Sequence, residues 1–511
     1  MNKKTVSIII PVYNEEKTLS SVLESCQQLN PMEIIAVANG CTDRSIEIAK
    51  NHNCKVLIYK ERLGHNVGRA IGAKEAKGDI LLFIDADFTI SSSTLNQFLE
   101  PLVEGTADVV LNNLDYIFKK VYPPHSITIW KQVMNHFLHC PNLNSDSLVA
   151  VPHAMTKEVI KKIHSDSLKN PIYAQLKIIQ HQFRISRHMS IDVVTINRVH
   201  PKQHKNTPTT LSISEKRIIG NHIETIADWI HETNASRLNY SDENRRRNII
   251  ENLKSNKLEP MPKIITGWGK HSNIYAGKQL SVIIPAHNED RTIEAVIQEV
   301  RKLEPLEIIV VVNGTTDHTE EIVKKSGATV IVYDEKLGND TGRAIGAYFA
   351  KGDILLFIDG DIIIPSQDLL PFVHAIQNGT DLALNNLEYL MKRAPVYIVT
   401  ACKYAVNLAC DRKDLGVGSS VAIPHAFSRK CIDEIGFDVL VSPVIAQVKT
   451  ILSGLNIQNV HSVEVDKMNR IRPEKHFAKK GELSSATKQI IGDHIEGISY
   501  LIKQKGKRGL F

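Results

Sequence analysis

The sequence lacks paired cysteines at any metal-binding spacing. Its seven cysteines are scattered along the chain, and none belongs to a CxxC pair. An odd, dispersed set of thiols is not typical of a disulfide framework or of a structural zinc site. We therefore expect free thiols in a reducing compartment, which predicts a cytoplasmic location.

The sequence also lacks a long apolar run. No apolar run reaches about 18 uninterrupted residues, so we expect no transmembrane segment. The most apolar candidate, residues 394–410, contains Lys403 and Asn407 and is better explained as a helix packed in a core. The short apolar run near the N-terminus ends before Asn14 and predicts a strand, not a signal peptide. The basic tail, residues 502–511, allows peripheral contact with an anionic membrane surface, although a solvated terminus explains it too.

Neither charge sign dominates the composition. The chain has 62 Lys and Arg against 56 Asp and Glu, a formal net charge of +6 over 511 residues. Nucleic-acid binding usually needs a concentrated basic face, so we expect no nucleic-acid partner. The small excess is compatible with an anionic ligand. An apolar content of 42% with 23% charged residues predicts an ordinary globular protein, long enough for two domains.

The chain contains two copies of a similar sequence. The segment AKGDILLFID occurs unchanged at residues 76–85 and 350–359, an offset of 274. At the same offset SIIIPVYNEE (7–16) matches SVIIPAHNED (281–290), and later segments match at offsets of 273 and 272. A repeat of this length indicates duplicated domains.

The repeat sets the predicted domain boundaries. We predict a first domain at residues 1–232 and a second at residues 279–511. Residues 233–278 fall outside the repeat, and their polar, charged and Asn-rich character suits a linker or an interdomain brace.

Each copy alternates short apolar runs with helical patterns. In the first copy VSIII, EIIAVA, KVLIY and DILLFI are rich in β-branched residues, as expected for parallel strands buried on both faces. Helical segments at residues 17–29 and 44–52 lie between them. This order predicts an α/β fold, with a doubly wound, mostly parallel sheet flanked by helices in each domain. Ligands bind such sheets beyond the carboxyl ends of the strands.

An acidic pair follows the fourth apolar run in both copies. Asp85 and Asp87 are separated by one small residue, as are Asp359 and Asp361. Such carboxylates are oxygen ligands for a hard divalent cation, Mn2+ or Mg2+, and leave positions open for diphosphate oxygens. A turn or capping role would explain a single pair, but this pair occurs twice at a strand end. We expect Asp87 and Asp361 to bind the metal and act in catalysis, and Asp85 and Asp359 to lie at the nucleotide-sugar.

The ordered motifs SIIIPVYNEE, IIAVANGCTD, GRAIGA and ILLFIDAD resemble those of family 2 glycosyltransferases with the GT-A fold. The resemblance is strong over the first part of each copy. It implies two tandem GT-A-type domains that each transfer a sugar from a nucleotide-diphospho-sugar with a divalent metal. It also implies a nucleoside pocket lined by Pro11, Asn14, Glu15, Pro285, Asn288 and Glu289.

The base-reading position departs from this family. Members carry two aspartates before a glycine at the end of the second strand, whereas this chain has Ala38-Asn39 and Val312-Asn313. An amide can both donate and accept, so these asparagines can pair with a uracil edge. A UDP-sugar is the favoured donor, while the departure at this position leaves the identity of the base open.

An arginine before the fourth strand also matches the family in both copies. The resemblance implies that Arg69 and Arg343 clamp phosphate or stack near the base. An arginine on a helix surface, held in an ion pair, is an equally good explanation.

Neither copy has the acidic pair that supplies a catalytic base in inverting members. In its place both copies share P-x-x-A-Q-x-K, which contains Gln175 and Gln447. This late segment is similar to that of retaining enzymes such as glucosyl-3-phosphoglycerate synthase. The similarity implies a catalytic place for the two glutamines and retention of anomeric configuration, in which the leaving diphosphate assists the acceptor.

The same resemblance implies a third metal ligand late in each copy. His204 and His476 occupy matching places in NRVHPKQH and NRIRPEKH. Imidazole suits Mn2+ better than Mg2+, so we expect Mn2+ to be the better activator. Surface histidines in a basic loop would look the same.

Four residues are expected to face an acceptor, whose identity the sequence does not define. They are Asn113, His153, Asn386 and His425. An asparagine turn and a structural histidine are the competing explanations.

The main functional alternative treats one copy as catalytically degenerate and acting as a binding or scaffold module. The first copy is then the candidate, because it reads HSDS (164–167) where the second has a glycine, Gly436. A sugar nucleotidyltransferase is disfavoured, since no G-x-G-x-R loop follows the first strand.

Overall fold

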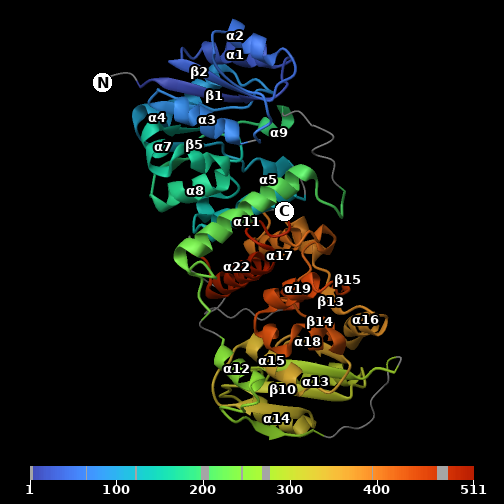
Figure 1. Ribbon diagram of the computed structural model, residues 1–511. Coiled ribbons are helices and arrows are strands. Elements are labelled where there is room, and N and C mark those ends of the chain that lie inside the picture. The colour runs from blue at the N-terminus through green and yellow to red at the C-terminus, as the bar shows by residue number, and fades with distance from the viewer. Residues whose placement is uncertain are drawn as a thin grey trace. The chain divides into compact units, whose positions relative to one another are not determined.

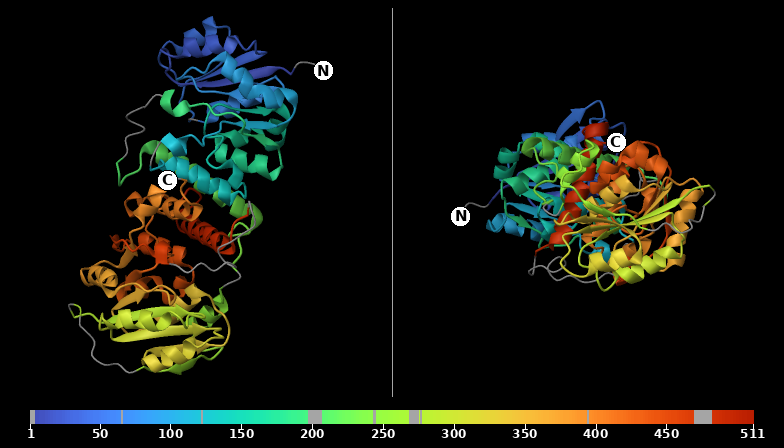
Figure 2. Two further views of the ribbon diagram at one scale, coloured as in Figure 1. Left: turned by 180° about the vertical axis from the view of Figure 1, so that it is seen from behind. Right: turned by 90° about the horizontal axis from the view of Figure 1, so that it is seen from below.

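A computed structural model describes residues 4–64, 66–120, 123–196, 207–242, 245–267, 275, 277–393, 395–468 and 482–511. The chain forms two compact units. One comprises residues 1–207, 211–228 and 511, and the other residues 208–210 and 229–510. Figures 1 and 2 show an α/β sheet within each unit.

The described part of the first unit builds one sheet and its covering helices. The strands are β1 (Val6–Val12), β2 (Glu33–Asn39), β3 (Lys55–Tyr59), β4 (Ile80–Phe83), β5 (Val109–Leu111), β6 (His153–Thr156) and β7 (Ile185–Ser186). The α-helices are α1 (Leu19–Gln27), α2 (Ser45–Asn51), α3 (Val67–Glu75), α4 (Ser92–Glu104), α5 (Ile117–Lys120), α6 (Ser126–Phe137), α7 (Lys157–Ile163), α8 (Pro171–Gln180), α9 (Val193–Ile196) and α11 (Ile213–Thr233), the last of which continues into the second unit. The short 3-10 helices are η1 (Pro141–Leu143) and η2 (Ser165–Lys169).

The described part of the second unit repeats this series and adds elements before it. The strands are β8 (Lys263–Ile265), β9 (Leu280–Ala286), β10 (Glu307–Asn313), β11 (Thr329–Tyr333), β12 (Ile354–Phe357), β13 (Leu382–Asn385), β14 (His425–Ser428) and β15 (Ile457–His461). The α-helices are α12 (Arg247–Lys254), α13 (Ile293–Arg301), α14 (Thr319–Ser326), α15 (Asn339–Phe349), α16 (Ser366–Gln377), α17 (Ile398–Ala409), α18 (Arg429–Ile435), α19 (Pro443–Leu452), α20 (Val465–Met468) and α22 (Ser485–Lys505). The short 3-10 helices are η3 (Glu388–Lys392), η4 (Lys413–Leu415) and η5 (Phe437–Val441).

Both sheets have the same strand order. The first reads β3-β2-β1-β4-β6-β5-β7, with β1 parallel to both β2 and β4 and β6 antiparallel to its neighbours. Read in the same direction, the second is β11-β10-β9-β12-β14-β13-β15, and the additional strand β8 lies at its edge beside β11. The prediction of a mostly parallel α/β sheet flanked by helices in each domain is confirmed. Because β2, β1 and β4 are adjacent and parallel, the segments that follow them meet at one edge of the sheet.

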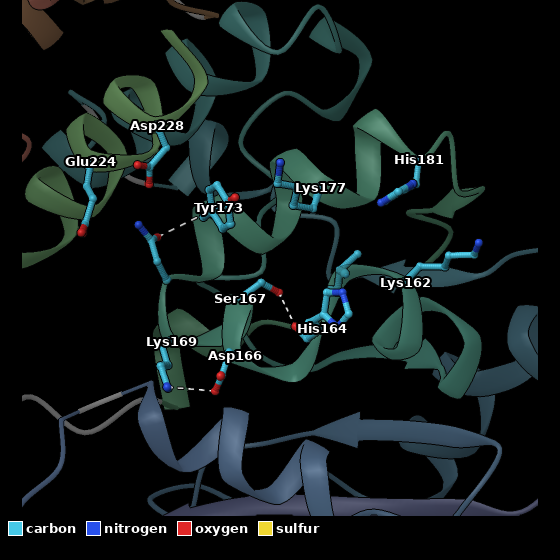
Figure 3. A pocket seen from close by; sticks show the side chains of 12 residues that line it. Lys162, His164, Asp166, Ser167, Lys169, Tyr173, Lys177, His181, Glu224 and Asp228 are labelled. Atoms are coloured by element: carbon cyan, nitrogen blue, oxygen red, sulfur yellow. Dashed lines mark hydrogen bonds and ion pairs between the residues drawn. The ribbon is translucent and has the colours of Figure 1, made fainter. Parts of the chain in front are cut away.

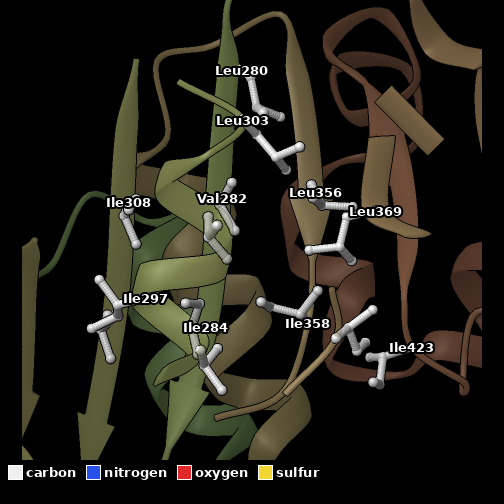
Figure 4. Close-up of a cluster of buried hydrophobic side chains, with 14 of the residues drawn as sticks. Leu280, Val282, Ile284, Ile297, Leu303, Ile308, Leu356, Ile358, Leu369 and Ile423 are labelled. Atoms are coloured by element: carbon white, nitrogen blue, oxygen red, sulfur yellow. The ribbon is translucent and has the colours of Figure 1, made fainter. Parts of the chain in front are cut away.

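Helices cover both faces of each sheet and pack their apolar sides against it. Successive residues of a strand point to opposite faces, so Ile8 and Ile10 pack with α1 and α4, whereas Ile9 packs with α3, α7 and α8. In the second sheet Val282 and Ile284 pack with α13 and α16 (Figure 4). The opposite face of that sheet packs against α12, α15 and α18. Burial on both faces explains why the strands read as continuous apolar runs.

A glycine on the helix before the fourth strand allows that helix to lie very close to the central strand. A Cβ on Gly72 of α3 would lie 2.4 Å from Cγ2 of Ile9, and a Cβ on Gly346 of α15 would lie 2.3 Å from Cγ2 of Ile283. Side chains in a close-packed interior do not approach to such distances. The repeated GRAIGA motif is therefore explained by helix–strand packing, and its arginine is carried close to the sheet.

Much of the segment predicted as a linker belongs to the second unit. α12 packs Ile249, Ile250 and Leu253 into the core, and β8 extends the sheet by pairing antiparallel with β11. The linker prediction for residues 233–278 is therefore wrong for these elements. The polar composition of the segment concealed a short amphipathic helix and a β-branched strand.

The structure bears on three smaller predictions. Within residues 394–410, α17 packs into the core, with Ala401, Ala405 and Leu408 fully buried. Among the described residues, no helix has the length and apolar character needed to cross a membrane. All seven cysteines are free.

We expect Gly346→Ala to destabilise the second unit by about 1–3 kcal/mol, the usual cost of overpacking a core. The cause is the contact that the new Cβ would make with Ile283, which outweighs the better helix propensity of alanine. Hydrogen exchange at the amides of β9 during urea titration measures the effect. Lys325→Ala on the exposed face of α14 is the control and should change stability by less than about 0.5 kcal/mol. Equal stability of the two variants would refute the packing explanation.

Candidate functional site

The acidic pair lies directly beyond the carboxyl end of a buried strand in both units. β4 ends at Phe83, and the side chains of Asp85 and Asp87 are partly exposed. The hydroxyl of Thr18, at the start of α1, donates to the carbonyl oxygen of Ala86 at 2.8 Å. The second unit repeats this contact between Thr292 and Gly360, also at 2.8 Å. The residue between the two aspartates is thus fixed to the neighbouring loop.

A buried arginine holds the first carboxylate of each pair. The Arg69 side chain is 3% exposed, and its Nη2 donates to Oδ1 of Asp85 at 2.8 Å. In the second unit the Arg343 Nη2 donates to Oδ1 of Asp359 at 2.6 Å. The surface ion pair considered for these arginines is excluded by their burial. Two arginine–aspartate contacts at matching positions show that both units build the same local arrangement.

The predicted nucleoside-pocket residues connect the loop after β1 to the loop after β2. Asn14 has φ 55°, in the left-handed region that asparagine tolerates better than most residues. Its Oδ1 accepts a hydrogen bond from the Thr42 amide at 2.7 Å, and the Glu15 amide donates to Ser45 Oγ at 2.8 Å. Pro11 lies beside α3, where a Cβ on Gly68 would be 3.1 Å from the proline Cβ.

The second unit arranges the matching residues in the same way. Asn288 has φ 59°, and its Oδ1 accepts from the Thr316 amide at 2.8 Å. The Glu289 amide donates to Thr319 Oγ1 at 2.7 Å, and Pro285 packs against α15. These residues therefore line up along the sheet edge that carries the acidic pair.

Asn39 and Asn313 hold the loop before the helix that carries the arginine. Asn39 donates to the Gly64 carbonyl at 2.9 Å and accepts from the Leu63 amide at 2.5 Å. Asn313 is fully buried and accepts from the Leu337 amide at 3.0 Å. Reading a base would require these amides to exchange a main-chain partner, so the structure gives both asparagines a role in shaping the loop.

The structure corrects the catalytic prediction for Gln175 and Gln447. Gln175 is 3% exposed; its Nε2 donates to Asn135 Oδ1 at 2.7 Å, and its Oε1 accepts from the Leu148 amide at 3.1 Å. Gln447 makes the same contacts with Asn407 and the Ser420 amide, at 2.7 and 2.8 Å. Buried amides with both ends occupied support the backbone instead of reaching a substrate.

The structure also corrects the acceptor-facing prediction for the two histidines. His153 is 1% exposed and stacks on Phe83, with ring centroids 4.9 Å apart. His425 is 3% exposed and stacks on Phe357 at 5.1 Å. Each ring packs on the last residue of the strand that precedes the acidic pair. The histidines are therefore buried against the strand and do not face an acceptor.

The predicted acceptor asparagines lie in turns. Asn113 Oδ1 accepts from the Asp115 amide at 3.0 Å and from Arg187 Nη2 at 3.2 Å. Asn386 Oδ1 accepts from the Glu388 amide at 3.2 Å. Both side chains are partly exposed, so an acceptor contact stays a prediction.

His204 and His476 lie outside the described residues. Among the residues that the structure describes, no group of three or more His, Cys, Asp and Glu could hold a metal. The donor set at each acidic pair is two carboxylates, which suits Mn2+ or Mg2+ when ligand oxygens fill the other positions. The described residues therefore fit a cation that is shared with a bound diphosphate.

A cavity of about 650 Å³ in the first unit contains none of the predicted site residues. Figure 3 shows its walls, from α7, η2, α8 and α11. In the second unit α12 contacts the matching elements: Lys254 pairs with Asp438 at 2.6 Å, and Arg247 Nη1 donates to Ser442 Oγ at 2.7 Å. The two copies thus differ at this place, because one is covered by a segment that has no counterpart in the other.

The sequence-based prediction missed two lysines and one acidic residue. Lys131 and Lys403 recur at the 272 offset, and burial lowers the pKa of each to about 8. Asp340, on the second unit's arginine helix, bonds Arg343 Nη1 at 2.8 Å. Comparing the copies could have found all three, because the lysines repeat and Asp340 replaces Asn66.

The family described as glycosyl transferase family 2 matches residues 7–163 and 281–389. One matched segment falls in each repeat, and together the segments cover more than half of the chain.

Curated relatives match over shorter stretches. An uncharacterized glycosyltransferase of Haemophilus influenzae is 33% identical over 125 residues, which are 23% of this chain and 49% of the relative. Undecaprenyl-phosphate 4-deoxy-4-formamido-L-arabinose transferase of Pectobacterium carotovorum is 32% identical over 133 residues, 23% of this chain and 40% of the relative. Glucosyl-3-phosphoglycerate synthase of Mycobacterium tuberculosis is 36% identical over 121 residues, which are 21% of this chain and 37% of the relative. The chain therefore spans less than half the length of each of these relatives.

A crystal structure of that synthase in complex with Mn2+, uridine diphosphate and glucosyl-3-phosphoglycerate matches at 26% identity and a TM-score of 0.31. The match covers 41% of this chain and 81% of the other.

We expect the imidazoles of His153 and His425 to stay neutral from pH 8 down to pH 5. Burial, with the nearby charge of Arg69 or Arg343, lowers the pKa of each to about 3, whereas an unfolded histidine titrates at about 6.5. The unfolded chain therefore takes up the protons first, and the stability contributed by these rings is complete above about pH 6.5 and is lost as the pH falls toward 3.

NMR of the ring protons in the folded protein measures this, with His153→Gln and His425→Gln spectra for assignment and the urea-unfolded chain as control. A titration midpoint between pH 5 and 8 in the folded protein would contradict the packing role.

Proposed function

The chain belongs to glycosyl transferase family 2, and from this premise we propose that each repeat transfers a sugar from a nucleotide-diphospho-sugar to an acceptor with a divalent cation. The observation that carries the proposal is the acidic pair. It follows a buried strand in both units, and its first carboxylate is bonded to a buried arginine. A strand-end carboxylate pair suits a cation that bridges protein and diphosphate.

The chain's own residues have distinct parts in this proposal. Asp87 and Asp361 would hold the cation, and Asp85 and Asp359, each bonded to its arginine, would lie at the nucleotide-sugar. The cation, when bound, neutralises charge that develops on the departing nucleoside diphosphate. The loops after β1 and β2, joined through Asn14 and Thr42, offer a wall for the nucleoside.

We favour a UDP-sugar as donor, with Mn2+ the better activator and His204 and His476 as additional metal ligands. The reaction breaks the bond between the anomeric carbon and the diphosphate oxygen and forms one to an acceptor hydroxyl oxygen. We favour retention of configuration, in which the hydroxyl proton passes to the leaving diphosphate. The anomeric coupling constant of the product, read by NMR, separates retention from inversion.

The alternative, in which one copy is degenerate, has one observation in its favour. His164 in the first unit adopts φ 61°, where the second unit has Gly436 at φ 83°. A β-carbon in this conformation is strained, so the first copy keeps the turn with a residue less suited to it. We nevertheless favour two active copies, because both retain the acidic pair and its arginine.

Location and membrane contact are also proposals. Free cysteines support a reducing, cytoplasmic compartment. The exposed Lys503, Lys505 and Lys507 near the C-terminus support transient contact with an anionic membrane surface.

We expect Asp87→Ala combined with Asp361→Ala to abolish sugar transfer, a loss of at least about 100-fold, because both cation sites lose a carboxylate. Transfer from UDP-, GDP-, ADP- and dTDP-sugars with Mn2+ measures this, with circular dichroism to confirm folding. Asp79→Ala combined with Asp353→Ala is the matched control, since these exposed aspartates lie at the opposite ends of the same strands. Equal activity of the parent with and without a chelator would contradict the cation's role.

A further inference from the structure

Arg245 lies between the two repeats in sequence and is almost completely buried in the second unit. Its side chain is 1% exposed. The guanidinium uses all five of its N–H groups. Nε and Nη2 donate to Asp340 Oδ2 at 3.0 and 2.6 Å, Nη1 and Nη2 donate to Asp493 at 2.6 and 2.8 Å, and Nη1 also donates to Asp242 at 3.0 Å. A buried guanidinium with every donor occupied is fixed in one orientation.

Asp340 connects this arginine to the acidic pair. Its Oδ2 accepts from Arg245, and its Oδ1 accepts from Arg343 Nη1 at 2.8 Å. Arg343 in turn donates through Nη2 to Asp359 at 2.6 Å. A continuous chain of buried ion pairs therefore runs from the inter-repeat segment to the first carboxylate of the second acidic pair.

The first unit has no equivalent chain among its described residues. At the position of Asp340 it has Asn66, at the position of Asp493 it has Asn221, and Arg245 has no counterpart in the repeat. Arg69 pairs with Asp85. Each acidic pair thus has its own buried arginine, but only the arginine of the second pair is also bonded to another carboxylate.

The charges around the first arginine differ in the same direction. Burial, followed by the charges of Arg62 and Arg69, lowers the pKa of Arg217 on α11. The second copy has Gln489 at this position. The first site therefore has an arginine where the second copy has a glutamine, and it has no counterpart of Asp340. The second site has Arg245 in addition, but that charge is balanced by Asp242 and Asp493.

We propose that Asp340, held by Arg245, is a positioning residue that neutralises Arg343 and gives the second site a higher affinity for a divalent cation than the first. This inference rests on the proposed function, since it concerns the cation at the acidic pairs. The inter-repeat segment is then a working part of the second site.

The physical reason is the competition for carboxylate charge. Where Arg343 is shared between two carboxylates, its charge is already balanced by Asp340, so Asp359 keeps more of its own charge for the cation. Where Arg69 has Asp85 beside it and no counterpart of Asp340, its positive charge acts on both the carboxylate and the incoming cation. The fixed position of Arg245 also keeps Arg343 and Asp359 from reorienting when the cation enters.

The test exchanges the two residues between sites and measures Mn2+ binding in the presence of saturating UDP, from the electron paramagnetic resonance signal of free Mn2+. The Asp87→Ala background reports the second site, and the Asp361→Ala background reports the first. We expect Asp340→Asn to weaken binding at the second site by about tenfold and Asn66→Asp to strengthen binding at the first by about threefold to tenfold. Asp353→Asn, which removes a carboxylate at the other end of the sheet, should change affinity by less than about twofold.

Each outcome decides the inference. If the parent binds Mn2+ and both exchange variants bind it with unchanged affinity, the inference is wrong but the proposed function stands. If the parent binds no Mn2+, both the inference and the proposed function are wrong. If Asp340→Asn fails to fold, Asn66→Asp decides by itself, because a gain in affinity at the first site cannot come from misfolding. Arg245→Met should lower affinity in the Asp87→Ala background and leave the Asp361→Ala background unchanged; equal loss at both sites would also overturn the inference.

Discussion

The ion pair between a buried arginine and the first carboxylate of the acidic pair is the interaction on which the rest of the site depends. Removing two charges from water is costly, and their attraction compensates only when the geometry is good. The fold supplies this geometry by bringing the arginine's helix against the central strand. The contact is so close at Gly72 and Gly346 that no side chain would fit at these positions. The position of Asp85 and Asp359 is therefore set by backbone packing several residues away.

The same logic explains why buried polar groups cluster behind the acidic pair. The Asn39 and Asn313 amides hold the loop that leads into the arginine helix. His153 and His425 stack on the residue that ends the strand. These two asparagines and two histidines do not have to touch a substrate to occur in both copies. Each fixes either the end of the strand or the loop before the helix that carries the arginine. Repetition between the copies thus marks support of the site as well as chemistry.

The sequence predicted the sheets well, because buried parallel strands leave continuous apolar runs that alternate with amphipathic helices. It also placed the acidic pair at the end of a strand, but it did not predict that Arg69 and Arg343 bond the first carboxylate of each pair. It could not separate contact with a ligand from support of the backbone at Gln175, Gln447 and the two histidines, since a polar residue repeated in both copies looks the same in either role. α12 and β8 were missed because short elements in a polar segment are recruited by tertiary contacts that composition does not reveal.

The two copies have diverged around a common centre. Arg245 and α12 reinforce the second unit, while the corresponding region of the first unit contains a cavity lined by polar side chains such as Lys169, Asp166 and His164. Duplication therefore gave two acidic pairs of the same design in different electrostatic surroundings. Under our proposal, such a difference would let the two sites bind the cation at different concentrations.

The central claim is that each acidic pair holds a divalent cation together with a nucleoside diphosphate. Crystals grown with UDP and Mn2+, measured at the manganese absorption edge, test it most directly. The account predicts two anomalous peaks per chain, one between Asp85 and Asp87 and the UDP diphosphate, the other in the same place at Asp359 and Asp361. Clear UDP density with no anomalous peak at either pair, or peaks only at sites elsewhere on the chain, would contradict the account.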